Sequence, residues 1–271
     1  MNIQLLSDLH LESHPQFVPQ AARGADVLVL AGDIGSYQSG SSLQGDDFGL
    51  SRFANWPVPV VFVPGNHEYD ALDFDETHQR LQAVCARHGF HFLERSVLTQ
   101  GDLGLSGAPV RFVGTTLWTD FDALTPNHAT ATEALRAREK ACRAANFYLK
   151  KTNTTRHGQA FLAEQVREQG LTCQHWLREA LAQPYDGQTV VITHFAPSLQ
   201  SADPRYGMTP GTAGFCNQLD DLLPQAQLWL HGHLHCPQNY VAHGCRVVAN
   251  PLGYARKNEQ VHFQASSVIP L

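Results

Sequence analysis

Five short clusters of Asp, Asn and His residues offer most of the chemistry in this sequence. Each cluster directly follows a short apolar run, and a continuous apolar run that stops at such a cluster is typical of a buried strand. Carboxylate, amide and imidazole groups, with no thiolate among them, suit first-row divalent metal ions. The clusters are Asp8-Leu9-His10, Gly32-Asp33, Gly65-Asn66-His67-Glu68, His194 and Gly232-His233-Leu234-His235.

The spacing inside the clusters predicts that side chains converge on metal ions. Asp8 and His10 are two residues apart, and so are His233 and His235. If the chain stays extended there, alternate side chains point to the same side and can bind one ion. Asp33 then becomes the candidate carboxylate that bridges two ions. Any one of these residues alone is more often a turn former or a hydrogen-bonded histidine, so the prediction rests on all five clusters.

Composition places limits on the kind of protein. The 271 residues, 43% of them hydrophobic, suffice for one large core, and we expect a single α/β domain over residues 1–271. The net charge of −6, without a basic stripe, argues against a nucleic-acid partner. No stretch is long and apolar enough to cross a membrane. With no secretory leader before the first strand and six scattered cysteines read as reduced thiols, we expect a cytoplasmic protein.

Local patterns predict the elements around the clusters. Apolar runs predict strands at residues 3–6, 25–31, 58–63, 90–93, 111–114, 190–193, 228–230 and 245–250. A helix is predicted over 74–89, with Gly89 as its stop. A helical insert is expected at about 125–183, and Thr130-x-x-Glu133 is a capping box at its start. Further helices are predicted over 159–168 and ending at 176–181, while loops 35–47 and 198–214 are expected to shape a substrate pocket.

The order and content of the five clusters resemble the calcineurin-like metallophosphoesterase superfamily, and the resemblance runs from Asp8 to His235. It implies a four-layer αββα sandwich with two central mixed β-sheets. It also implies a dinuclear centre between the loops of the two sheets, in which Asp33 bridges. One ion would take Asp8, His10, Asp33 and His235, and the other would take Asp33, Asn66, His194 and His233. His231 is not part of the superfamily pattern and is predicted to be structural.

The same resemblance implies a reaction. A hydroxide bridging two divalent ions would attack a small-molecule phosphate ester. His67 would protonate the leaving oxygen or stabilise charge on the phosphoryl group, and Glu68 would orient its neighbours rather than bind metal. Manganese is the expected metal, with iron, zinc, nickel and cobalt as alternatives. The oligomeric state stays open.

The residues around the clusters indicate which branch of the superfamily the chain resembles. Asp33 is followed by Ile34-Gly35-Ser36 and not by the Asp-Arg-Gly of the Ser/Thr protein phosphatases. The chain resembles small bacterial phosphodiesterases, with Phe195 where many of them have a second histidine, and an apolar pocket wall there favours a diester. A phosphomonoesterase is the alternative reaction. A non-catalytic scaffold on the same fold is a third reading, against which the complete set of predicted ligands argues.

Overall fold

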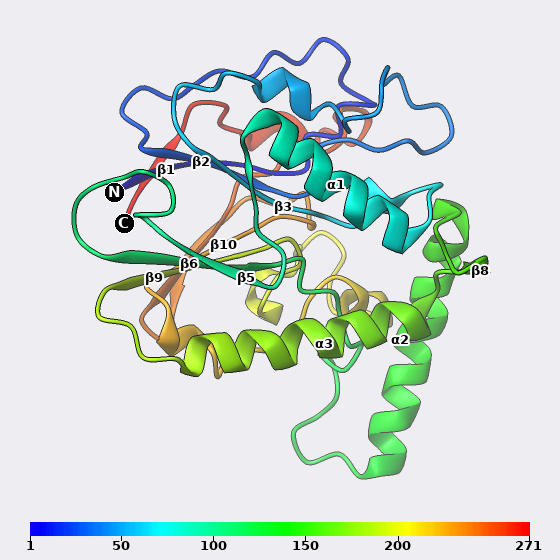
Figure 1. The fold of residues 1–271 in the computed structure, drawn as a ribbon. Helices are drawn as coiled ribbons and strands as arrows, with labels where there is room; N and C mark the ends of the chain where they lie inside the picture. Colours follow the sequence, from blue (N-terminus) through cyan, green and yellow to red (C-terminus); the bar gives the residue numbers. More distant parts are fainter.

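The computed structural model describes residues 1–271, and two β-sheets packed face to face form its centre (Figure 1). The strands of the first sheet are β1 (Asn2–Leu6), β2 (Val27–Ala31), β3 (Val60–Val63), β4 (His91–Phe92) and β13 (Val268–Pro270). Those of the second are β5 (Ser96–Thr99), β6 (Val110–Thr115), β9 (Gln188–Thr193), β10 (Leu228–His231), β11 (Gln238–Ala242) and β12 (Cys245–Ala249). Their spatial orders are β13-β1-β2-β3-β4 and β11-β12-β10-β9-β6-β5.

Parallel pairing brings the predicted clusters to one edge of the molecule. In the first sheet β1, β2 and β3 are parallel neighbours, with Leu5 opposite Val29 and Val29 opposite Val61. In the second sheet β9 and β10 are parallel, with Val190 opposite Leu228. Because parallel strands end at the same edge, the segments after all five strands lie together.

The space between the sheets is filled by one face of each. Alternate side chains of a strand point to opposite faces, so every second residue enters this core. The buried residues there include Leu5, Val29, Val61, Phe112, Ile192 and Leu230. A larger buried cluster lies on the outer faces of the sheets and under the helices. The apolar runs are therefore continuous because both faces of the central strands are covered.

Helices cover the outer faces and complete four layers, as expected (Figure 1). Helix α1 (Phe74–His88) lies over the first sheet, and α3 (Ala163–Ala182) lies over the second. The Asp73 side chain caps α1 by accepting two backbone N–H groups, and Gly89 ends it at φ 70°. The predicted helix over 74–89 is confirmed. No helix in the chain combines the length and apolarity that crossing a bilayer requires, and all six cysteine thiols are free.

The region between β6 and β9 differs in part from the prediction. The capping box of Thr130 and Glu133 begins α2 (Ala131–Thr152) as predicted. The two further helices predicted there are one continuous helix, α3, and residues 159–160 instead form strand β8, which pairs with β7 (Thr155–Arg156). Gly170 lies inside this helix and is needed for packing. A Cβ at this position would lie 2.5 Å from the carbonyl oxygen of Thr119.

Candidate metal centre

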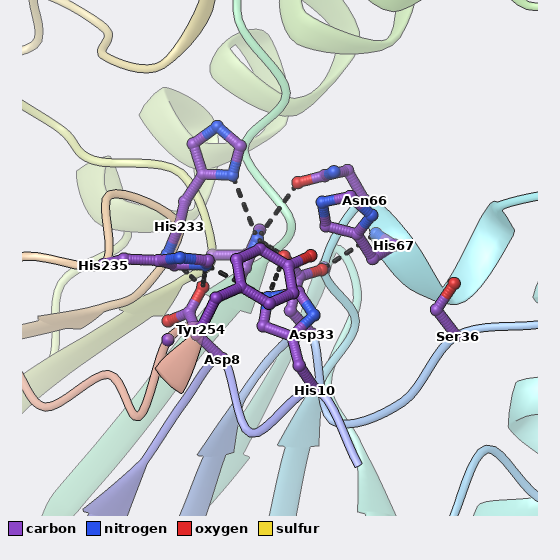
Figure 2. Close-up of polar contacts among 12 residues, drawn as sticks. Asp8, His10, Asp33, Ser36, Asn66, His67, His233, His235 and Tyr254 are labelled. Atoms are coloured by element: carbon purple, nitrogen blue, oxygen red, sulfur yellow. Dashed lines mark hydrogen bonds and ion pairs between the residues drawn. The ribbon is translucent and has the colours of Figure 1, made fainter. Parts of the chain in front are cut away.

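The structure brings the seven predicted metal ligands together where the two sheets end, and Figure 2 labels all of them except His194. The Asp and His residues among them fall into two groups, within each of which the candidate ligand atoms lie within 4.8 Å of one another. The first group is Asp8, His10, Asp33 and His235. The second group is Asp33, His194 and His233. Asp33 is common to both groups, which is the position predicted for a bridging carboxylate.

In the first group, imidazole nitrogens and carboxylate oxygens face one another. The Nε2 atoms of His10 and His235 are 3.0 Å apart. Asp8 Oδ1 lies 3.4 Å from Nε2 of His235, and Asp33 Oδ2 lies 3.9 Å from Nε2 of His10. All four side chains are almost completely buried. Candidate ligand atoms from the loops of both sheets therefore face one another around a common point.

In the second group, the Nε2 atom of His194 is the centre of the contacts. It lies 3.2 Å from Asp33 Oδ2 and 3.2 Å from Oδ1 of Asn66. It also lies 3.3 Å from Nδ1 of His233. Asn66 is therefore brought to this group as the sequence predicts, with its amide oxygen toward the other three side chains (Figure 2).

The backbone at the ligands is not extended, and the expected strand-like alternation was wrong. Left-handed conformation occurs at Asp8 (φ 52°), His10 (φ 43°), Asp33 (φ 54°), His233 (φ 74°) and His235 (φ 50°). Each positive φ bends the chain sharply, so the side chains converge from turns rather than from one face of a strand. Such a conformation costs roughly 1–3 kcal/mol at a non-glycine residue and concentrates at functional sites. Five instances in one cluster indicate that the surrounding fold maintains a specific geometry.

The glycines of the clusters make room for the carboxylates. A Cβ on Gly65 would lie 2.2 Å from Oδ1 of Asp33, and one on Gly232 would lie 2.6 Å from Oδ2 of Asp8. No rotamer change removes the first clash, because the Asp33 backbone nitrogen would also be only 2.5 Å away. The glycines in the motifs therefore permit close packing of neighbouring loops around the site.

The donor set fits divalent cations. Asp8 Oδ2 and Asp33 Oδ2 are buried carboxylate oxygens that accept no hydrogen bond. A buried carboxylate oxygen that accepts no hydrogen bond is costly, and a cation would satisfy both oxygens. Oxygen and imidazole donors of this kind suit Mn, Fe, Co, Ni and Zn. The residues present thus fit the two-ion centre that the sequence predicts.

Two glutamates that the sequence analysis did not single out support the first group. Glu12 Oε1 lies 3.0 Å from Nδ1 of His10, and Glu259 Oε2 lies 2.6 Å from Nδ1 of His235. When these Nδ1–H groups donate to the carboxylates, both Nε2 atoms are left as acceptors that face each other. In the neutral imidazoles, both Nε2 lone pairs would be available to a cation.

His67 lies beside the cluster with a carboxylate of its own. Its Nδ1 atom is 2.5 Å from Oδ2 of Asp70, and its backbone N–H donates to Oδ1 of Asp33 at 2.8 Å. Burial would lower the pKa of His67, but the nearby charges of Asp70 and Asp33 raise it well above its usual value. These two charges therefore favour the protonated imidazole. Asp70, only three residues further on, was not predicted, because nothing distinguishes it from a loop aspartate.

Glu68 accepts backbone hydrogen bonds rather than facing the ligands. Its carboxylate accepts the N–H groups of Asp33, Ile34 and Gly65 at 3.1, 2.6 and 2.8 Å. Burial, followed by the charge of Asp33, raises the pKa of Glu68 to about 7. The residue joins the segment after β2 to the segment after β3. This geometry is consistent with the orienting role expected from the sequence.

The charges of the candidate ligand side chains shift one another's pKa values. Burial alone would raise the pKa of Asp33, but the charges of His194 and His67 hold it well below its usual range. Burial would likewise lower the pKa of His194 and of His235, while the carboxylates around them raise each to about 9. Asp33 thus remains a carboxylate, the form that binds metal.

Two neighbouring residues have packing contacts. His231 is fully buried, 3.0 Å from the Ser201 hydroxyl through Nε2, and it does not join the ligand groups. Phe195 stacks on His233 with ring centroids 4.0 Å apart and is only 3% exposed. It therefore packs against the His233 ring, and its part in a wall of the substrate pocket stays a prediction.

Comparisons with known proteins agree with this geometry. The chain is 23% identical to the uncharacterized protein L509 of Acanthamoeba polyphaga mimivirus, over 94% of this chain and 92% of that protein. The fold is similar to that of phosphopantetheinyl hydrolase from Mycobacterium tuberculosis, with a TM-score of 0.68 and 19% identity over 94% of this chain and 90% of that one. The family profile described as calcineurin-like phosphoesterase matches residues 1–237. The chain belongs to the calcineurin-like phosphoesterase family.

Proposed function

We propose that this protein is a metal-dependent phosphodiesterase. The observation that carries the proposal is Asp33, which is shared by two ligand groups and has one buried oxygen without a hydrogen-bond donor. The family uses a dinuclear divalent metal centre. Ions bound there supply Lewis-acid activation of water and neutralise the phosphoryl oxygens.

The chain's own residues supply the rest of the chemistry. Asp33, Asn66 and the four histidines of the two groups would hold the ions, together with Asp8. His67 keeps its Nδ1–H on Asp70, so its Nε2–H is the proton available for the leaving oxygen. Glu68 keeps the two loops that carry Asp33 and Asn66 at a fixed separation. These roles divide binding, proton donation and positioning among different side chains.

A singly charged diester suits the site better than a monoester. A monoester dianion carries more charge, and sites that bind it commonly use an arginine clamp. No hydrogen bond or ion pair joins a lysine or arginine to a side chain of the seven predicted ligands; Arg205 is paired with Asp203 and reaches only the His235 carbonyl. Phe215, 39% exposed and 5.4 Å from the His233 ring, offers an apolar contact for an organic group.

The first test compares two esters. Metal-stripped protein refilled with Mn²⁺ should hydrolyse bis(p-nitrophenyl) phosphate in preference to p-nitrophenyl phosphate, and Asp33→Ala should abolish this activity. Preference for the monoester would select the phosphomonoesterase alternative. Bound metal without turnover of either ester would direct the search to narrower substrates, among them phosphopantetheinyl esters, and continued failure there would favour a non-catalytic scaffold.

The second test isolates His67. His67→Ala should keep two bound ions and lower kcat by about 10²–10⁴-fold, because it removes a proton donor and leaves every predicted ligand in place. Metal content and kcat are measured on the same preparation. Unchanged kcat would remove His67 from the mechanism.

The free cysteines support a reducing compartment such as the cytoplasm.

A further inference from the structure

The segment after β12 packs directly on the first ligand group. It lies beyond residue 237, where the family match ends. The Tyr254 ring stacks on His10 with centroids 4.2 Å apart and meets the edge of His235 at 5.1 Å (Figure 2). The Gly253 N–H donates to the Asp8 carbonyl at 2.9 Å, which ties the segment to the loop after β1.

Glu259 at the end of this segment is almost fully buried, with its side chain 3% exposed. Its Oε2 atom accepts from Nδ1 of His235 at 2.6 Å and from the Tyr254 N–H at 2.8 Å. Lys257 Nζ is 3.8 Å from the other carboxylate oxygen. Gly253, at φ 66°, permits this approach, since a Cβ there would lie 2.6 Å from Cβ of Glu259.

This contact determines which ring nitrogen of His235 carries the proton and which one is left to bind an ion. A carboxylate at Nδ1 keeps the proton on that nitrogen, leaves the lone pair on Nε2 and raises its basicity as a ligand. Nε2 is the atom that faces His10 and Asp8. We propose that Glu259 is a positioning residue that orients His235 for the ion held by the first ligand group. The proposal rests on the metal centre proposed above.

The second ligand group lacks such a carboxylate. His194 places Nδ1 2.8 Å from the Ala31 carbonyl oxygen, a neutral acceptor. Glu12 supports His10 in the same way that Glu259 supports His235, so both buried glutamates act on the first group. Loss of Glu259 should therefore weaken one of the two ions and leave the other unchanged.

The experiment measures metal binding directly in the full chain. Equilibrium dialysis against graded Mn²⁺ should give two ions per chain in the unaltered protein. Glu259→Ala should weaken one of them by about 10–100-fold, the usual effect of removing such a carboxylate, and leave the other intact. Glu259→Gln keeps an oxygen that can accept from Nδ1 and should recover part of the loss. Lys257→Ala, which leaves the Glu259–His235 contact in place, is the matched control and should bind both ions normally.

A spectroscopic measurement separates positioning from general loosening. In NMR spectra of the Zn²⁺-loaded protein with ¹⁵N-labelled histidine, the Nδ1–H of His235 should give a signal because it is protected from exchange with water. That signal should disappear through exchange with water in Glu259→Ala and persist in Glu259→Gln. Failure of the unaltered protein to bind any ion would overturn the metal centre itself. Two normal ions and a protected His235 signal in Glu259→Ala would overturn only the role of Glu259.

Discussion

At the scale of single residues, the hydrogen-bond partner at Nδ1 of each histidine determines what its Nε2 atom can do. His10 and His235 have glutamates at Nδ1 and direct Nε2 toward the ligand cluster. His194 has the backbone carbonyl of Ala31 at Nδ1 and directs Nε2 toward Asp33 and Asn66. His67 also has a carboxylate partner, but it lies outside both ligand groups. In the function proposed above, the same imidazole–carboxylate pairing would serve metal binding in one place and proton donation in another.

The Asp70–His67 pair makes a pH-dependent prediction. Asp70 is the first of the charges that raise the pKa of His67, so Asp70→Asn should lower that pKa. His67 would then lose its proton at lower pH, and the alkaline limb of the kcat profile should move to lower pH by about 1–3 units. The profile is measured on Mn²⁺-loaded protein. Asp75→Asn, which changes a carboxylate paired with Arg156 instead, should leave the limb unmoved. An unmoved limb in Asp70→Asn would contradict the proton-donor assignment.

At the scale of elements, the site depends on how loops are held at the strand ends. The segments after β2 and β3 are joined by the three backbone hydrogen bonds to Glu68. Two of these bonds share one oxygen, so the carboxylate acts as a single anchor for both loops. Asp33, which sits between the anchored groups, is thereby fixed in its left-handed conformation.

Glu68→Gln tests this anchor. The amide has only one acceptor oxygen, and its NH₂ group would face at least one backbone N–H. We expect the free energy of unfolding to fall by about 1–3 kcal/mol, the cost of an unsatisfied buried donor. Urea denaturation of the metal-free protein measures the change without any contribution from bound ions. Glu139→Gln, on the exposed face of α2, should change stability by less than about 0.5 kcal/mol. Equal stability of the two variants would show that Glu68 does not hold the loops.

The elements also show what a sequence can and cannot predict. The central strands were predictable because burial on both faces makes β2 and β9 continuous apolar runs. The edge strand β11, Gln238–Ala242, contains no continuous apolar run, gives no such signal and was missed. That the seven candidate ligands lie together was predictable because they stand at strand ends. Glu259 was not, because its contact with His235 spans 24 residues and has no sequence pattern.

At the scale of the whole molecule, the predicted ligands come from both sheets. Asp8, His10, Asp33 and Asn66 follow strands of the first sheet, and His194, His233 and His235 follow strands of the second. The two sheets also meet through the nonpolar core between them. Ions bound at both ligand groups would therefore join the sheets at their shared edge.

Metal binding should consequently stabilise the whole fold. An ion that binds only the folded state adds about 2.7 kcal/mol when its free concentration is 100 times Kd. The midpoint of thermal unfolding, followed by calorimetry, should rise with added Mn²⁺ and return when a chelator removes it. Asp33→Ala should lose most of this rise, because Asp33 belongs to both groups, whereas His67→Ala should keep it. An undiminished rise in Asp33→Ala would place the stabilising ions elsewhere, since both ligand groups lose a carboxylate in this variant.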